Sequence, residues 1–423
     1  MSVGIDIVDI SRIEKIDKEK FSGKILSDIE LKNTYKTENL AGIFAAKEAF
    51  SKAMGTGLLG FGFKDISVMH NPQGKPYLDF SSKLEKIMEQ KGVMSTELSI
   101  SHEKGYAVAV VNLTIDNKSY LYEKTIKKLK DAPENTITPD IIKGILKKRE
   151  KDIHKGDCGR LLIIAGSIGL TGAAIMSSVS SLRCGAGLIT LVCPKSLNHI
   201  FEAAIPEVMT MPVDDTDGII NKNEIDKIID KAKKSDCVLF GPGLGANDNI
   251  SEILKELISN CKNIVIDADG INVLSKNIDI LKEHKCNIVI TPHIGEFSRL
   301  TNLETKEILK NTAEYAKEFA AKHNICVILK SHKTVVAMPD GKIYENHLGN
   351  PGMATGGTGD VLSGATASFF AQGYDIEKSS LLGVYIHSLA ADMAAFVTGE
   401  YGLIPSDIIS YIPFAIKNSI GEV

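Results

Sequence analysis

The stretch 349–364 holds the residues of this sequence that are best suited to chemistry. Six of its sixteen residues are glycine, and Asp360 directly follows a Gly-Gly-Thr-Gly run. Glycines let successive peptide N–H groups turn toward one point, where they can hold an anion. The apolar residues after Asp360 have helical spacing, so we expect the loop to end at a helix N-terminus, which also attracts phosphate. A carboxylate beside such a loop suits phosphoryl transfer to a hydroxyl group, with Asp360 as the base.

Six short apolar runs precede this loop, and none of them alternates with polar residues. Such runs predict parallel strands that are buried on both faces of a sheet. Helical stretches separate the runs, which predicts a doubly wound, three-layer α/β sandwich with a mostly parallel sheet. The predicted strands cover residues 160–166, 188–192, 237–241, 263–267, 287–291 and 326–330, and the helices include residues 172–184, 223–234, 250–260 and 306–323.

Several of these predicted strands end in glycine or polar residues. Ligands of open α/β sheets bind beyond the carboxyl ends of the strands, so we expect these residues to line one site. Lys330 and Lys333 offer positive charge for a nucleotide phosphate. Three acids could hold Mg²⁺ directly or through water: Asp267, Asp269 and Glu296. The glycine-rich stretch lacks the Walker A pattern G-x-x-x-x-G-K-[ST], which excludes the most common phosphate-binding loop.

A second set of candidates lies in the first 115 residues. Asp6 belongs to a predicted strand at residues 3–10, and Glu48 to a predicted helix at residues 40–53. Two carboxylates from separate elements suit Mg²⁺, which binds one or two carboxylates together with substrate phosphates and water. Polar donors that could bind a pyrophosphate accompany them: Lys47 on the same helix, Lys75 in a turn, and Ser101 and His102 at the end of a strand.

The motifs G-I-D-I-V, F-A-A-K-E-A-F, N-P-Q-G-K-P and S-I-S-H occur in this order within residues 1–115. This part of the chain resembles the holo-acyl-carrier-protein synthase family, which implies an α+β domain. The resemblance implies transfer of 4′-phosphopantetheine from coenzyme A to a serine of apo acyl carrier protein. A metal-bound water or Glu48 would accept the serine proton. It also implies a homo-oligomer, because members of that family form trimers with sites between subunits.

The same resemblance assigns residues of the first 115 positions to ligands. It makes Asp6 and Glu48 the magnesium ligands. It places Lys47, Lys75, Ser101 and His102 near the phosphates of coenzyme A.

The sequence G-G-T-G-D before a helix resembles the ribokinase-like superfamily. More narrowly, residues 137–423 resemble the ADP- or ATP-dependent NAD(P)H-hydrate dehydratases in four separated motifs. These are H-K-G-D-C-G-R-L-L-I-I-A-G-S, G-P-G-L-G, T-P-H-I-G-E-F-S-R-L and N-P-G-M-A-T-G-G-T-G-D-V-L-S-G. The implied reaction repairs NADH or NADPH whose nicotinamide ring has gained water. The nucleotide would phosphorylate the ring hydroxyl after Asp360 deprotonates it, and phosphate would then leave.

This second resemblance also assigns residues to ligands. The positions that match the hydrate site are Ala173, Gly243, His293 and Asp360, and those that match the nucleotide-phosphate site are Lys330, Ser331, His332, Lys333, Thr334 and Gly359. The sequence departs from the family pattern at Gly270, where a larger residue is usual, and at Ser331, where glycine is usual.

Length and composition are those of a globular protein with two domains. The 423 residues are 43% hydrophobic, and a net charge of -4 argues against a nucleic-acid surface. No apolar run approaches the ~20 residues of a membrane span, and the first residues indicate a strand and not a signal peptide. Seven scattered cysteines without a C-x-x-C indicate reduced thiols and a cytoplasmic protein. We place the domains at residues 1–118 and 136–423, with a lysine-rich linker at residues 119–135.

The sequence therefore predicts a bifunctional enzyme, and some alternatives stay open. The stretch 349–364 could be a flexible loop with an aspartate helix cap. The C-terminal part could be a small-molecule kinase for a vitamin precursor, because the same base and loop would serve. One half could also be a non-catalytic sensor of coenzyme A or a dinucleotide.

Overall fold

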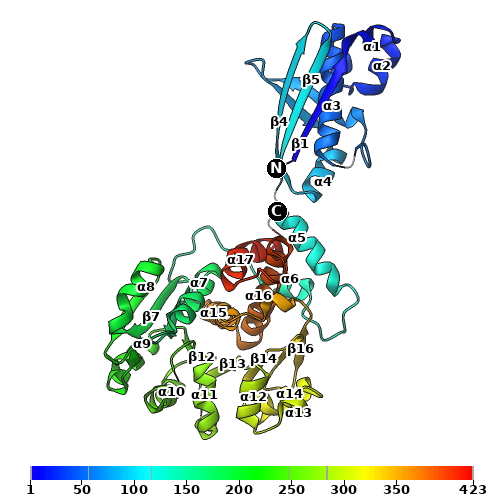
Figure 1. Cartoon of the computed structure of the whole chain (residues 1–423). Helices are drawn as coiled ribbons and strands as arrows, with labels where there is room; N and C mark the ends of the chain where they lie inside the picture. Colours follow the sequence, from blue (N-terminus) through cyan, green and yellow to red (C-terminus); the bar gives the residue numbers. More distant parts are fainter. Residues whose placement is uncertain (1, 56, 116, 246, 283, 422–423) are drawn as a thin grey trace. The chain divides into compact units, whose positions relative to one another are not determined.

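A computed structural model describes residues 2–55, 57–115, 117–245, 247–282 and 284–421. By its internal contacts the chain divides between Leu121 and Tyr122 into an N-terminal unit and a C-terminal unit. Each unit has its own hydrophobic core, and helix α5 (Asn117–Ile126) crosses the division in the chain (Figure 1).

The N-terminal unit is an α+β fold in which one helix covers an antiparallel sheet of order β1-β5-β4. The helix α3 contacts all three strands. Gly4 permits the close approach, because a Cβ at this position would lie 1.9 Å from the carbonyl oxygen of Ala49. The elements are β1 (Ser2–Asp9), α1 (Ile10–Glu14), α2 (Lys18–Ile25), α3 (Thr37–Ala53), β2 (Ile66–His70), β3 (Pro76–Phe80), α4 (Ser82–Gln90), β4 (Val93–Glu103) and β5 (Tyr106–Ile115).

The two faces of this sheet differ in their burial. On β5 the residues Ala107, Ala109, Val111 and Leu113 are buried against the helix side, whereas the residues between them are only half-buried. Paired residues of an antiparallel ladder share one face, so the register of the strands assigns each neighbour to a side. The face turned away from α3, here called the outer face, exposes the apolar side chains of Val3, Ile5 and Ile7.

The C-terminal unit is built on a nine-stranded sheet of order β16-β15-β14-β13-β12-β11-β6-β7-β8. The strands from β14 to β8 are parallel, and β15 and β16 add an antiparallel hairpin at one edge. The strands are β6 (Arg160–Ile164), β7 (Leu188–Pro194), β8 (Met209–Val213), β11 (Cys237–Phe240), β12 (Asn263–Ile266), β13 (Asn287–Ile290), β14 (Cys326–Leu329), β15 (Thr334–Ala337) and β16 (Ile343–Asn346), with a small ladder of β9 (Asp215–Thr216) and β10 (Ile219–Ile220) beside it.

Helices cover both faces of this sheet, which gives the three layers. On one face α7, α15 and α16 contact the strands and α17 packs on α7 and α16. The helices after α5 are α6 (Pro139–Ile145), α7 (Thr171–Arg183), α8 (Asn198–Ala204), α9 (Ile225–Ala232), α10 (Asp248–Asn260), α11 (Asp269–Lys276), α12 (Ile294–Thr301), α13 (Thr305–Ile308), α14 (Thr312–His323), α15 (Thr358–Ala371), α16 (Ile376–Thr398) and α17 (Pro405–Ser419).

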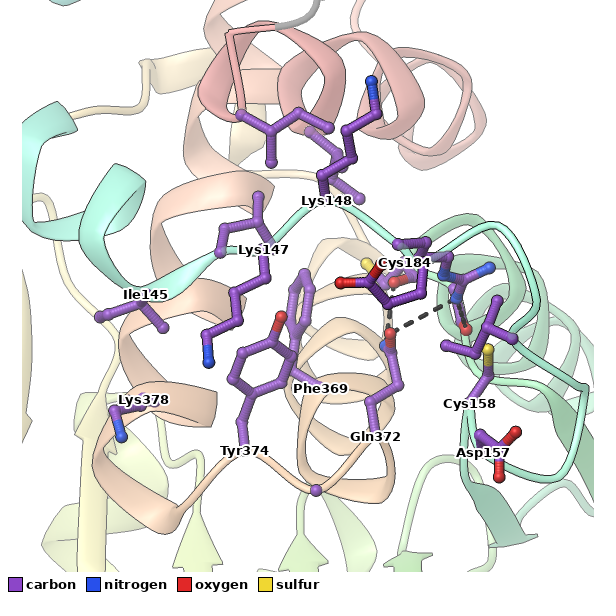
Figure 2. Close-up of a pocket in the computed structure, with 18 of the residues that line it drawn as sticks. Ile145, Lys147, Lys148, Asp157, Cys158, Cys184, Phe369, Gln372, Tyr374 and Lys378 are labelled. Carbon is purple, nitrogen blue, oxygen red and sulfur yellow. Dashed lines mark hydrogen bonds between the residues drawn. The ribbon is translucent and has the colours of Figure 1, made fainter.

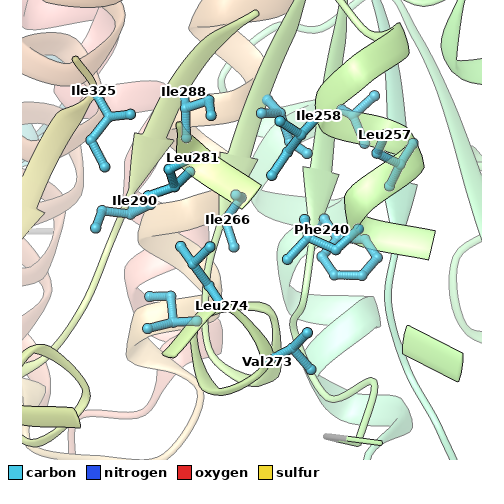
Figure 3. Packing of buried hydrophobic residues seen from close by; sticks show 14 of the residues in the cluster. Phe240, Leu257, Ile258, Ile266, Val273, Leu274, Leu281, Ile288, Ile290 and Ile325 are labelled. Atoms are coloured by element: carbon cyan, nitrogen blue, oxygen red, sulfur yellow. The ribbon is translucent and has the colours of Figure 1, made fainter. Parts of the chain in front are cut away.

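Alternate residues of the central strands enter two different buried layers. Ile266, Ile288 and Ile290 pack with Leu257 and Leu274 in the cluster beneath α9 to α14 (Figure 3). The residues between them face the α15 side and are buried as well. This double burial explains the unbroken apolar runs of the sequence.

The predicted fold class is confirmed, and the six predicted strands are β6, β7 and β11 to β14. The sequence interpretation missed β8 and the edge hairpin of β15 and β16. The helix predicted at residues 306–323 is two helices, because α13 ends at Ile308 and α14 begins at Thr312.

Residues 122–135, in the predicted linker, pack on the C-terminal unit. Thr125 and Leu129 are buried, and the ammonium of Lys128 lies 3.0 Å from the carboxylate of the buried Asp392. Ile137 then joins the edge of β16 through a hydrogen bond to the carbonyl of Glu345. The domain limits at residues 118 and 136 remain a proposal.

One helix among the described residues, α16, is long and apolar enough to cross a membrane by length and composition. Its apolar window is 78% buried inside the C-terminal unit, as expected for the central helix of a folded core. Burial in the protein therefore accounts for its composition.

Candidate functional sites

Two oppositely charged side chains meet at the carboxyl ends of β12 and β14. Asp267 directly follows β12 and Lys330 directly follows β14, and only β13 lies between these strands. The Nζ atom of Lys330 lies 2.9 Å from Oδ1 of Asp267 and 3.9 Å from Oε2 of Glu296. Burial lowers the pKa of Lys330, but the two carboxylates raise it by more, so the ammonium stays charged.

The glycine-rich loop brings Asp360 to this ion pair. Gly357 has a φ of +96° at the N-cap of α15, a conformation that suits glycine. A Cβ on Gly359 would lie 3.2 Å from Nζ of Lys330, so the first turn of α15 lies directly against the lysine. Burial, and then the carboxylate of Asp267, raise the pKa of Asp360 to about 7. A carboxylate with this pKa can accept a proton near neutral pH.

Ala173 and Gly243 lie next to each other on the same rim. Gly243 has a φ of +63°, and a Cβ there would lie 3.0 Å from the Cβ of Ala173. Met176, one turn further along α7, touches the glycine loop, because a Cβ on Gly357 would lie 2.4 Å from its Cε. The glycine-rich loop, α7 and the turn after β11 therefore form one continuous surface.

His293 caps the N-terminus of α12 beside these residues. Its Nδ1 accepts hydrogen bonds from the backbone N–H groups of Gly295 and Glu296, at 2.9 and 3.3 Å. Burial, and then the charge of Lys330, lower the pKa of His293. The ring is neutral near pH 7, half-exposed, and its Nε2 faces Glu296 at 3.7 Å.

A cavity of about 940 Å³ lies between the lysine turn after β14, the glycine-rich loop and α16. Its lining includes many of the residues predicted from the sequence to bind a nucleotide. These are His293, Lys330, Ser331, His332, Thr334 and Gly359. Lys333 is exposed outside the lining, and its backbone is held in the turn by the hydroxyl of Ser331. Ala173, Gly243 and Asp360 lie outside this lining.

Two buried polar atoms of this cavity have no hydrogen-bond partner among the described residues. They are Nε2 of His387 on α16 and the hydroxyl of Thr358 at the start of α15. Burial lowers the pKa of His387 to about 4, although a hydrogen bond with the Thr358 backbone raises it. Unpaired buried polar groups are rare in proteins, so each of these atoms is a candidate to pair with a water or a ligand in the cavity.

The acids proposed for Mg²⁺ in this unit are engaged in other contacts. Asp267 pairs with Lys330, and Asp269 accepts hydrogen bonds from the Gly245 N–H and the Asn272 amide. Among the described residues, no three His, Cys, Asp or Glu side chains are grouped to hold a metal ion. The arrangement favours a site for the nucleotide phosphates over a metal site made by protein alone.

In the N-terminal unit, Asp6 of β1 and Glu48 of α3 lie close together. Both are on the helix side of the sheet, where Asp6 is paired in register with the buried Ala109. Burial, and then the charge of Asp6, raise the pKa of Glu48. Lys52, one turn further along α3, donates to Oδ1 of Asp6 at 2.8 Å. Two carboxylates that repel each other fit Mg²⁺ when phosphates and water complete its shell.

Lys47 lies in the core of this unit, where its ammonium is held by other groups of the protein, and its contact with coenzyme A phosphate stays a prediction. Its side chain is 0% exposed, and its ammonium donates to Glu30 at 2.5 Å and to the carbonyl oxygens of Ile25 and Phe63 at 2.7 and 3.1 Å. Burial lowers the pKa of Lys47, and Glu30 partly offsets this. All three donor positions of the ammonium are occupied within the protein.

The remaining predicted coenzyme A residues do not meet Asp6 and Glu48 within one copy of the unit. Ser101 pairs with Val108 and so belongs to the outer face, opposite Asp6. His102 pairs with Ala107, on the helix side near the turn after β4. Lys75 is exposed and lies 2.9 Å from Glu97, whose ladder partner Asn112 is on the outer face.

Sequence reasoning missed several residues of these sites. His387 and Thr358 line the nucleotide-sized cavity, and Glu30 and Lys52 accompany the N-terminal carboxylates. Thr358 stood within the glycine-rich motif and could have been found there. His387 lies in a helix whose neighbours are all buried, so the sequence offers no pattern that separates it from core residues.

Known proteins match both units. Residues 161–414 match the family model described as NAD(P)H-hydrate dehydratase, and residues 2–111 match that of the 4′-phosphopantetheinyl transferase superfamily. The chain is 35% identical over 280 residues to the bifunctional NAD(P)H-hydrate repair enzyme Nnr of Moorella thermoacetica, which covers 66% of this chain and 53% of the relative. It is 34% identical to the ADP-dependent (S)-NAD(P)H-hydrate dehydratase of Lactococcus lactis, over 66% of this chain and 98% of the relative.

A solved structure agrees with these matches. The ADP/ATP-dependent NAD(P)H-hydrate dehydratase of Bacillus subtilis, co-crystallised with ATP/Mg²⁺, is 26% identical at a TM-score of 0.58 and covers 69% of this chain and 99% of that one. The chain spans about half the length of the bifunctional relatives it matches, including the Moorella enzyme. Both resemblances drawn from the sequence motifs are confirmed. The chain belongs to the NAD(P)H-hydrate dehydratase family, and its residues 2–111 resemble the 4′-phosphopantetheinyl transferase superfamily.

Proposed function

We propose that the C-terminal unit uses ADP or ATP to convert NADH or NADPH hydrate back to the reduced nicotinamide. The observation that carries this proposal is the carboxylate of Asp360, whose pKa is about 7, at the head of a glycine loop beside Lys330. Asp360 removes the proton of the ring hydroxyl, and the oxygen attacks the terminal phosphoryl group of the nucleotide. Phosphate then leaves the ring, a proton is lost from the adjacent ring carbon, and the double bond returns.

The neighbouring residues take complementary roles in this proposal. The surface of Ala173 and Gly243 holds the dinucleotide hydrate, with the neutral ring of His293 beside it. The cavity beside Lys330 holds the phosphates of the nucleotide, and Gly359 leaves room for the lysine next to them. The ion pair with Asp267 fixes the ammonium in place.

Incubation of the full chain with NADH hydrate and ADP or ATP tests this function. Recovery of the absorbance of reduced nicotinamide, with one phosphate released per NADH formed, is the expected result. A protein that consumes nucleotide on vitamin-precursor alcohols and leaves the hydrate unchanged would be an ordinary small-molecule kinase.

The unpaired atoms of the 940 Å³ cavity give a prediction about nucleotide affinity. Replacing His387 by phenylalanine keeps a ring of similar size but removes Nε2, which has no partner in the described protein. We expect KM for the nucleotide to rise about tenfold, the value of one hydrogen bond, and the unliganded protein to become more stable. Steady-state kinetics and thermal unfolding measure both effects. His199→Phe, at an exposed histidine of α8, is the control, and an unchanged KM in His387→Phe would remove this histidine from the nucleotide site.

We propose that the N-terminal unit transfers 4′-phosphopantetheine from coenzyme A to a serine of an apo acyl carrier protein. Asp6 and Glu48 would hold Mg²⁺, and when bound the metal neutralises the pyrophosphate of coenzyme A. Glu48 would also accept the serine proton. In the protein without metal, burial and the charge of Asp6 raise the pKa of Glu48. The proximity of the two carboxylates carries the proposal.

The double variant Asp6→Asn, Glu48→Gln is expected to lose transfer by about 10³-fold or more, because both the anchor for the metal and the proton acceptor are removed. The mass of the carrier protein before and after incubation with coenzyme A measures the reaction. Glu38→Gln, an exposed residue in the first turn of the same helix, is the matched control. Transfer that survives in the double variant and still requires magnesium would place the metal elsewhere.

We further propose that the outer face of the N-terminal sheet contacts other copies of the chain. Val3, Ile5 and Ile7 are each more than half exposed there, and Ser101 lies on that face while Asp6 lies on the opposite one. A neighbouring copy would bring the two sets of predicted coenzyme A residues together. Sedimentation of the full chain tests for a homo-oligomer, and a monomer with full transfer activity would contradict it. Reduced cysteines and soluble substrates favour the cytoplasm as its location.

A further inference from the structure

A second large cavity lies at the opposite end of α15 from Asp360. It measures about 1040 Å³ and is enclosed by the C-terminal ends of α7 and α15, by the segment 144–153 and by α17 (Figure 2). None of its lining residues belongs to the cavity that contains Lys330. Its volume is at the upper end of the range for small-molecule sites.

One wall of this cavity is aromatic and apolar. The rings of Phe369 and Tyr374 meet edge to face with their centroids 6.0 Å apart, and Tyr374 is half-buried. Pro413, Ile416 and Ile420 of the α17 region continue the apolar surface. Such a wall suits a planar ring, because aromatic pairs prefer offset or edge-to-face contact.

Charged side chains also line the cavity, and most of them are basic. Five cationic side chains stand against three acids: Lys147, Lys148, Arg149, Arg183 and Lys378 against Glu150, Asp157 and Asp375. Two of the acids are committed, because Asp375 pairs with Lys378 at 2.7 Å and Asp157 accepts the N–H of His154. The net charge of the lining is positive.

Some of these basic side chains compensate the negative C-terminal ends of helices, but this explains only part of the positive charge of the lining. The carbonyl groups at the ends of α7 and α15 carry partial negative charge. Arg149 already donates to the carbonyl of Gly185, and Gln372 donates to that of Cys184 at 3.0 Å. Lys147 and Arg183 are left without a hydrogen bond or ion pair among the described residues.

We propose that this cavity is a second binding site, separate from the catalytic one, for a phosphorylated compound that carries an aromatic ring. The ring packs against Tyr374, which rests edge to face on the buried Phe369, and the phosphate takes the donors of Lys147 and Arg183. Lys378 lies on the same side of the cavity as Tyr374 in Figure 2 and is paired with Asp375. Cation–phosphate hydrogen bonds are the strong, charge-assisted kind. Because α15 runs from this cavity to the glycine turn of Asp360, an occupant contacts the far end of the helix that carries the proposed base.

The absence of tryptophan from the sequence permits a direct test of binding. The variant Tyr374→Trp places a single tryptophan in the aromatic wall of the full-length chain. Its fluorescence is titrated with adenosine 3′,5′-bisphosphate, which has a ring and two phosphates. The assay needs no turnover, so its outcome does not depend on the dehydratase function.

A saturable change is expected, and adding Lys147→Glu with Arg183→Glu should weaken binding by about tenfold or more, since charge-assisted hydrogen bonds to the phosphate are lost. The control Lys151→Glu reverses a charge in the neighbouring exposed chain outside the lining and should leave the affinity unchanged. The proposal fails if the fluorescence does not saturate, or if charge reversal at Lys147 and Arg183 has no effect.

Discussion

Replacing Asp360 by asparagine is expected to lower the rate of NADH-hydrate conversion by about 10²–10⁴-fold, the usual contribution of a general base. Asparagine has the shape of aspartate but cannot accept a proton. Asp360 lies in the first turn of α15 beside the Lys330–Asp267 pair, where the hydroxyl of the hydrate would meet the nucleotide phosphate. Nicotinamide absorbance under saturating ADP or ATP gives the rate.

The pH dependence of kcat/KM of the wild-type enzyme should show the pKa of this carboxylate. Burial, followed by the charge of Asp267, raises the pKa of Asp360 to about 7. Only the ionised form acts as a base, so kcat/KM should fall about tenfold for each pH unit below 7 and level off above it. An aspartate with an ordinary pKa would keep its activity down to about pH 4.

The same substitution should make the protein more stable at alkaline pH. The pKa of Asp360 in the folded protein lies above its ordinary value of 3.8, so folding holds the proton more tightly and the ionised form lowers the free energy of unfolding. A rise from 3.8 to about 7 corresponds to about 4 kcal/mol at most. Asp360→Asn should gain part of this at pH 8, and the gain should shrink as the pH falls from about 7 and be absent below about 4.

Asp226→Asn, in the first turn of α9, is the control for this variant because its carboxylate is exposed and outside the site. It should change neither the rate nor the pH profile. Hydrate conversion near the wild-type rate in Asp360→Asn would assign the base to another residue. A fall in both activity and stability would mean that Asp360 supports the fold and not the reaction.

The parallel core of the C-terminal unit was predictable because its physical cause is visible in the sequence. Strands such as β12 and β13 are buried on both faces, and only unbroken apolar runs fit that environment. The edge hairpin of β15 and β16 was not predictable in the same way. The strand β16 is only half-buried and has the sequence I-Y-E-N, so it contains no unbroken apolar run.

The chemistry of the C-terminal site was predictable from motifs, but its electrostatics were not. Asp267 and Lys330 are 63 positions apart, and they meet only because β12, β13 and β14 are neighbours in the sheet. The raised pKa of Asp360 follows from that meeting and from burial.

Gly270, unusual for the family, has a packing reason, since a Cβ would lie 2.8 Å from Ile266 and 2.9 Å from the carbonyl of Phe240.

In the N-terminal unit, two adjacent residues of one motif lie in different surroundings. Lys47 and Glu48 are adjacent in the sequence, but successive residues of a helix point about 100° apart, so one site cannot take both side chains equally. Glu48 faces Asp6, and Lys47 faces the core among buried alanines and Phe50. A sequence motif records that a residue matters without recording whether it serves the ligand or the fold.

Replacing Lys47 by methionine is therefore expected to destabilise the N-terminal unit by about 3–5 kcal/mol, the loss that follows when one partner of a buried ion pair is removed. Methionine fills a similar volume, but the carboxylate of Glu30 would stay buried without its counter-charge. That carboxylate also accepts the N–H groups of Ser27 and Val68, both at 2.8 Å, which holds it in place. Hydrogen exchange of α3 and β1 in the full-length chain, measured against denaturant, gives the free energy of opening.

Two further variants show whether Lys47 stabilises the fold or binds the ligand. Lys20→Met removes an exposed pair with Asp17 in the same unit and should cost less than about 1 kcal/mol. The double variant Lys47→Met, Glu30→Gln removes the unpaired charge and should recover part of the loss, because the two residues are directly coupled. If Lys47→Met instead kept its stability and lost only affinity for coenzyme A, its ammonium would have to leave three internal partners to reach a phosphate. We expect the opposite result for Lys47→Met. Its stability should fall, and the affinity for coenzyme A should be unchanged in the fraction of the protein that remains folded.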